Sequence, residues 1–214
     1  MRVYLAAAAV VVVAAWAIVA IGNLGKPAEV LNAVHHDDAQ VPSICPWRDP
    51  ERDLRAFFGP GVSYSTEILV LSRARAWLVK AIGPTAELPA NVLYVRRVRR
   101  GDAFVGSIVT GRAPGRFGAV EVVVGVDPKG RIIGVRIQRS REVGASGRLL
   151  ASGKWLAAFA GKSAQDAFRP GADLPAASPG AEDTARAVSA EIRALLLELY
   201  AAERFHTGRL QGGV

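Results

Sequence analysis

The chain has 214 residues, of which half are hydrophobic and 21% are charged, and its formal net charge is +8. This length suits one globular domain of ordinary size with an appendage. The single cysteine, Cys45, excludes an internal disulfide framework.

A stretch without charged side chains, VYLAAAAVVVVAAWAIVAIGNLG, lies between Arg2 and Lys26. As a helix, such a stretch crosses the hydrocarbon core of a bilayer, which is about 30 Å thick. A cleaved signal peptide is the alternative, but its apolar core is usually shorter. We therefore predict a transmembrane anchor at residues 1–25. Arg2 and the terminal amine favour a cytoplasmic N-terminus, and hence a single-pass protein of the inner (cytoplasmic) membrane with its C-terminal domain on the periplasmic side.

Residues 26–50 are rich in Pro, Asp and His without clear periodicity, which predicts a tether. The run His35-His36-Asp37-Asp38 offers metal-ligand chemistry. Adjacent histidines rarely face one site, however, and no second ligand pair lies at a helpful spacing. We favour a solvated linker and predict no metal site.

A folded domain is predicted over residues 51–206, followed by a frayed tail at 207–214. Ile68, Leu71, Leu78 and Ile82 have helical spacing within TEILVLSRARAWLVKAIG, which predicts an amphipathic helix that ends before Gly83-Pro84.

The hydrophobic period then changes to two, which is typical of strands. NVLYVRRVRRGDAFVGSIVTG predicts a hairpin that turns at Gly101-Asp102. A second hairpin turns at Asp127-Pro128-Lys129-Gly130 and places two sets of apolar residues on one face: Val120, Val122, Val124 and Val126, then Ile133, Val135 and Ile137. This alternation predicts an antiparallel sheet with one covered face.

The last third of the chain contains a short predicted helix in GKWLAAFAGK, a loop at 169–181 and a long final helix. The final helix is predicted from one apolar stripe: Val188, Ile192, Leu195, Leu196 and Leu199. Helices before and after a small antiparallel sheet define an α+β domain.

The basic charge raises the question of partners. VRRVRRG could contact nucleic acid, but its arginines have the pattern of polar residues on a strand. We therefore expect no nucleic acid partner. Anionic membrane lipids, or acidic surfaces of other membrane-protein subunits, are the partners that this charge favours.

Three stretches resemble one known family: GRFGAVEVVVGVDPKGRIIGVRIQRSRE, REVGASG and GAEDTARAV. Their order is similar to that in the FMN-binding domain of membrane electron-transfer proteins, typified by the G subunit of the Rnf electron-transport complex and the C subunit of the sodium-pumping NADH:quinone oxidoreductase. The first stretch resembles the family's hairpin, the second its E-T-P-G-x-G loop, and the third its flavin-attachment motif. The predicted anchor before a domain also fits those subunits.

The resemblance implies a set of cofactor-binding positions: Glu142, Gly144 and Gly147 in the loop, and Gly180, Ala181, Glu182 and Thr184 in the attachment motif. Family members with covalent FMN esterify a threonine at the position of Glu182. Pro179 also replaces the usual hydroxyl residue before the glycine, and Ala176 replaces an aspartate. Thus the motif is degenerate.

A carboxylate at position 182 supplies no hydroxyl oxygen for a stable phosphoester. Glu182 and Asp183 can instead cap the backbone N–H groups of the helix that follows, which a phosphate would otherwise bind. Covalent FMN is therefore not expected. Attachment through Thr184 or Ser178 and noncovalent FMN are the alternatives that stay open.

No catalytic residue is predicted, because three histidines and one cysteine give no hydrolase pattern. For Trp155 and Phe159, core packing is favoured over flavin stacking. We expect a membrane-anchored extracytoplasmic accessory subunit, with a degenerate FMN-binding-like domain, that docks on or stabilises a larger membrane electron-transfer complex. The alternative is an FMN-carrying electron-transfer subunit of an Rnf-like complex, in which the flavin performs the chemistry.

Overall fold

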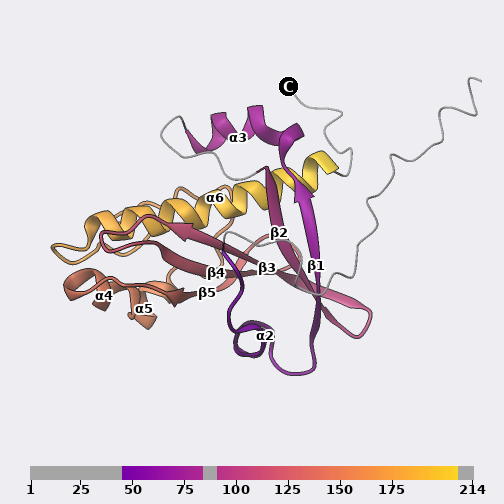
Figure 1. Ribbon diagram of the computed structural model, residues 1–214, viewed down its shortest axis with the longest axis horizontal. Helices are drawn as coiled ribbons and strands as arrows, with labels where there is room; N and C mark the ends of the chain where they lie inside the picture. Colours follow the sequence, from indigo (N-terminus) through magenta and orange to yellow (C-terminus); the bar gives the residue numbers. More distant parts are fainter. Residues whose placement is uncertain (1–44, 84–90, 207–214) are drawn as a thin grey trace, which may run out of the picture. The chain divides into compact units, whose positions relative to one another are not determined.

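The computed structural model describes residues 45–83 and 91–206, which form an α+β domain (Figure 1). Its elements in chain order are α2 (Pro50–Phe58), β1 (Ser63–Val70), the 3-10 helix η1 (Ser72–Ala74), α3 (Arg75–Ile82), β2 (Val92–Arg100), β3 (Ala103–Ala113), β4 (Val120–Val126), β5 (Ile132–Arg139), α4 (Gly144–Leu150), α5 (Gly153–Ala157) and α6 (Glu182–His206).

The five strands form one sheet in the order β1-β2-β3-β4-β5, and each pairs antiparallel with the next. Both predicted hairpins, β2–β3 and β4–β5, are therefore confirmed. The expectation of a single covered face is wrong, because every residue of β4 is buried, including Glu121 and Val123. Figure 1 shows why: α6 crosses one side of the sheet, and α2 lies on the other.

The larger core lies between the sheet and α6. The predicted apolar stripe of α6 is confirmed, since all of its members are buried: Val188, Ile192, Leu195, Leu196 and Leu199. They pack in the same cluster as the alternate valines of β4 and the side chains of Trp155 and Phe159. The two aromatic rings meet edge to face, with centroids 5.1 Å apart, so core packing is their role here.

The smaller core lies on the opposite face, under α2. Leu54 and Phe58 of α2 pack with Val98, Ile108 and Val123. Ile133 also packs against this cluster, contrary to the prediction that it shares a face with Val135. The register of β4 and β5 shifts between Gly125 and Val126, which offsets the alternation at the start of β5.

The predicted helix from Ile68 to Ile82 is wrong in its first half. Residues 63–70 form the edge strand β1, in which Ile68 pairs with Tyr94 of β2. Ile68 is 46% exposed, and only the later residues enter a helix, α3. Pairing with β2 runs along the whole length of this segment and satisfies the backbone groups on that side of the strand, so tertiary context prevails over a chance helical spacing.

The predicted span at residues 1–25 lies outside the described residues, as do most of the tether and the tail. Within residues 45–83 and 91–206, no helix is long and apolar enough to cross a bilayer. The longest, α6, has charged side chains such as Arg186, Glu191 and Arg193 along it and packs on the sheet. The predicted fold class, which included a transmembrane helix, is accordingly corrected to an α+β domain with a five-stranded antiparallel sheet. The predicted single-pass location in the inner membrane is corrected for the same reason, because none of the described helices can cross a bilayer.

Candidate functional site

The two stretches that resemble flavin-binding loops, 142–147 and 180–184, lie against each other. The Thr184 hydroxyl donates a hydrogen bond to Ser146 Oγ at 2.8 Å, and Ser146 Oγ lies 3.4 Å from the carbonyl oxygen of Gly180. A Cβ on Gly180 would touch Ala145. Figure 1 shows α4 and the start of α6 at the same end of the molecule.

Glu142 joins the first loop to the β3–β4 loop. Its Oε1 accepts a hydrogen bond from the backbone N–H of Phe117 at 2.9 Å, and Ser140 Oγ accepts from the backbone N–H of Glu142 at 3.0 Å. Gly147 packs so closely on this residue that a Cβ would lie 2.7 Å from the Glu142 carbonyl oxygen. Glu142 and Gly147 thus hold the loop in shape, and Gly144 begins α4 with a φ of 62°, a backbone angle that favours glycine.

Glu182 closes the start of α6. Its Oε2 accepts a hydrogen bond from the backbone N–H of Gly180 at 2.8 Å, while the carboxylate of the exposed Asp183 pairs with Arg186 one turn later. Ala181 is buried, and its carbonyl oxygen accepts from the N–H of Ala185 at 2.9 Å. The carboxylate of Glu182 therefore binds a backbone amide, that of Gly180, directly before the helix N-terminus. Backbone donors and the helix dipole attract anions to this place.

The hydroxyls near this position differ in orientation. Thr184 is buried and turned into the contact with Ser146, two positions round the helix from Glu182. Ser178 is exposed in the preceding loop, and its carbonyl oxygen accepts from the N–H of Ala181 at 3.0 Å. The sequence analysis named Glu182, Thr184 and Ser178 but not Ser146. Ser146 was missed because its hydrogen bond joins residues that lie 38 positions apart.

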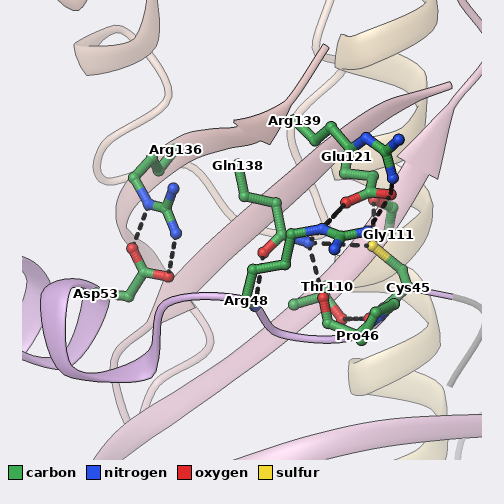
Figure 2. Close-up of polar contacts among 10 residues, drawn as sticks. All are labelled: Cys45, Pro46, Arg48, Asp53, Thr110, Gly111, Glu121, Arg136, Gln138 and Arg139. Carbon is green, nitrogen blue, oxygen red and sulfur yellow. Dashed lines mark hydrogen bonds and ion pairs between the residues drawn. The ribbon is translucent and has the colours of Figure 1, made fainter. Parts of the chain in front are cut away.

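A second polar cluster lies on the α2 side of the sheet, and no pattern in the sequence indicated it (Figure 2). Arg48 bonds both oxygens of the buried Glu121, at 2.7 and 3.1 Å. The Gln138 amide donates to the Pro46 carbonyl oxygen at 2.9 Å, and Thr110 Oγ1 donates to the carbonyl oxygen of Cys45 at 2.8 Å. These contacts fix residues 45–48, which the sequence assigned to the tether, onto strands β3, β4 and β5.

Cys45 is the thiol of this cluster. Its Sγ donates to the carbonyl oxygen of Gly111 at 3.2 Å, and burial together with the nearby Glu121 raises the pKa of the thiol to about 11. Because the thiolate is the nucleophilic form, Cys45 is a packing residue at neutral pH.

A metal centre is not formed by the part of the chain that the structure describes, where no three His, Cys, Asp or Glu side chains gather. The His35–Asp38 cluster lies outside that part. In comparisons with known proteins, no family model and no curated protein matches this chain. The membership of this chain in the FMN-binding domain family is therefore a hypothesis that rests on the three sequence stretches.

Proposed function

We propose that this protein is a non-catalytic accessory subunit whose domain is a degenerate relative of FMN-binding domains and which docks on or stabilises a membrane electron-transfer complex. The observation that carries the proposal is the hydrogen bond from the Gly180 amide to the Glu182 carboxylate, 2.8 Å long. At the position where relatives esterify FMN, the protein supplies an anion of its own.

The contacts of Glu182 argue against an FMN phosphate at this position. Two negative groups a few ångströms apart repel by about 1 kcal/mol in water and by more where solvent is excluded. Asp183 adds little to this repulsion, because its carboxylate is 93% exposed and pairs with Arg186. The residues present therefore do not fit the phosphate, and no redox step is assigned to the site.

Of the two neighbouring hydroxyls, only that of Ser178 is exposed and stays open as an attachment point, four positions before Glu182. Thr184 is buried and hydrogen-bonded to Ser146, so esterification there would require the start of α6 to separate from α4. Pro179 and Gly180 precede Glu182 without a hydroxyl. These features support an interaction role over electron transfer.

The test is the flavin content of the native protein. We expect the chain, purified with its partners, to show no flavin absorbance, either in the pellet or in the supernatant after acid precipitation. Intact mass should equal that of the polypeptide alone. An FMN adduct on the chain, or stoichiometric noncovalent flavin bound to it, would contradict the proposal.

The role of Glu182 is tested with Glu182→Thr, co-expressed with a flavin transferase, and with Asp183→Thr as the matched control. Both variants remove one carboxylate from the first turn of α6, but only the first places a hydroxyl at the acceptor position. We expect FMN mass on Glu182→Thr alone. Equal behaviour of the two variants would show that position 182 does not decide attachment.

A further inference from the structure

Two loops at one end of the sheet form an exposed surface of aromatic, aliphatic and basic side chains. The β3–β4 loop supplies Arg116 and Phe117, and the end of β5 with the segment that follows supplies Arg139, Arg141 and Val143. We call these five residues the Phe117 surface. The bond from the Phe117 amide to Glu142 holds the two loops together.

Both apolar members of this surface are exposed to solvent. Phe117 is 48% exposed and Val143 is 64% exposed. Single exposed hydrophobic residues are normal on a protein surface, whereas contiguous exposed apolar patches often mark binding sites. Phe and Arg are also enriched at the centres of protein interfaces.

The backbone presents Phe117 in a fixed position. A Cβ on Gly115 would lie 2.6 Å from the Gly118 carbonyl oxygen and 2.7 Å from Glu142 Oε1, so the loop closes tightly on the Glu142 carboxylate. Gly118 has a φ of 123°, which turns the chain directly after Phe117. A loop that is already ordered loses little entropy on binding.

The arginines of the surface are available to a partner. Arg116 lies over the Phe117 ring, 5.5 Å from its centroid, and within the described residues neither Arg116 nor Arg141 pairs with a carboxylate. Arg139 meets Glu121 only at 3.9 Å, and Glu121 already binds Arg48. Arg116 and Arg141 therefore carry positive charge next to Phe117 and two positions from Val143 in the chain.

The opposite end of the sheet provides a contrast. Phe104 is 40% exposed and also lies near arginines, but those arginines are engaged within the domain. Arg97 pairs with Glu67 and Glu203, and Arg100 donates to the Phe58 carbonyl oxygen. An exposed phenylalanine thus occurs at both ends. The arginine over the Phe104 ring, Arg97, is paired with two carboxylates, whereas Arg116 over the Phe117 ring is paired with none in the described residues.

We propose that the Phe117 surface docks a partner protein through an acidic face that surrounds an apolar depression. Charge complementarity selects this occupant, since Asp and Glu side chains would neutralise Arg116, Arg139 and Arg141 while the depression covers Phe117 and Val143. The inference rests on the proposed accessory function and names where the accessory subunit binds.

The test uses a photoreactive probe in living cells. Phe117→p-benzoylphenylalanine keeps the aromatic ring, and Phe104→p-benzoylphenylalanine is the matched control at the other end. We expect a single protein adduct from position 117, with the cross-link on a peptide rich in Asp and Glu, and little adduct from position 104. Reversing the charges with Arg116→Glu and Arg141→Glu should lower the yield roughly tenfold or more.

Several outcomes would overturn the docking surface: equal adducts at both positions, no adduct at position 117, an adduct insensitive to charge reversal, or an adduct to lipid, nucleic acid or a second copy of this chain. The flavin measurement separates this inference from the proposed function. A flavin-free protein that cross-links elsewhere leaves the accessory role standing and removes this surface, whereas bound flavin removes the accessory role.

Discussion

Asp53 shows how one buried charge organises the α2 face of the sheet. It has no exposed surface, yet both of its carboxylate oxygens are satisfied. Arg136 of β5 bonds both oxygens, and Trp47 Nε1 donates to Oδ2 at 2.6 Å. The bond to Asp53 raises the pKa of the Arg136 guanidinium, so this side chain keeps its charge. Asp53 therefore links α2, β5 and the segment before α2 (Figure 2).

We predict that Asp53→Asn destabilises the fold by about 3–5 kcal/mol, because it leaves Arg136 sheltered without an opposite charge. The free energy of unfolding in urea measures this effect. Glu51→Gln is the control on the same helix, and its exposed side chain should change stability by less than about 0.5 kcal/mol. Similar values for the two variants would show that the buried pair contributes nothing beyond helix α2 itself.

At the residue scale, the sequence predicted the local part of the candidate site and missed the tertiary part. The acidic first turn of α6 and the inward direction of Thr184 follow from the sequence. The predicted caps differ, because Glu182 bonds the amide of Gly180 before the helix and Asp183 pairs with Arg186. The hydrogen-bond partners of these residues could not be predicted in this way. Thr184 bonds Ser146, and Glu142 bonds the amide of Phe117, in both cases across a long sequence separation. Nothing in their neighbours indicates these bonds.

At the scale of elements, the same division holds. The hairpins at 92–113 and 120–139 were predictable because alternation and turn residues agree within each segment. β1 was not, since its strand state depends on pairing with β2 and its apolar residues also fit a helix. The second covered face was missed although Val98, Ile108 and Val123 lie on it, because the helix that covers it, α2, is remote in the sequence from these strands. α2 also packs on two glycines of this face, Gly125 and Gly134, which leave no hydrophobic signal of their own.

Those glycines form a platform for Phe57 of α2. Gly125 and Gly134 pair across β4 and β5, and a Cβ on either would approach the Phe57 ring to 2.6 or 2.7 Å. The ring therefore lies directly on the backbone of the sheet. Such close packing transmits any added volume to α2 as a whole.

We predict that Gly134→Ala destabilises the domain by about 1–3 kcal/mol, because the ring must move. Phe57→Ala should cost less in the Gly134→Ala background than in the wild type, with a coupling energy on the order of 1 kcal/mol. Urea unfolding of the four proteins measures the cycle. Gly153→Ala is the control, since a Cβ there meets nothing within 4 Å. If the losses in unfolding free energy of the two single variants add up to that of the double variant, the contact of the Phe57 ring with Gly134 is contradicted.

At the scale of the whole molecule, α6 connects the candidate site to the core. In its first turn, Glu182 accepts a hydrogen bond from the backbone N–H of Gly180. Its middle packs on β3, where Glu191 Oε1 accepts a hydrogen bond from the Arg112 backbone N–H at 2.9 Å. Glu191 is half-buried, and Glu198, two turns further along, is buried. Burial raises the pKa of Glu191 to about 7, and burial together with Glu191 raises that of Glu198 to about 8.

We predict that stability falls as the pH rises through this range. The folded protein keeps protons on Glu191 and Glu198 that the unfolded chain releases near its ordinary pKa of 4.5. The contribution is therefore full below about pH 4.5 and is lost as the pH rises through about 7 to 8. Between about pH 5 and about pH 9 the loss should be on the order of a few kcal/mol. Glu198→Gln keeps the shape without the charge, so urea unfolding should show a flatter pH profile for this variant and a wild-type profile for Asp183→Asn. A Glu198→Gln profile parallel to that of the wild type would show that this carboxyl does not hold its proton in the folded state.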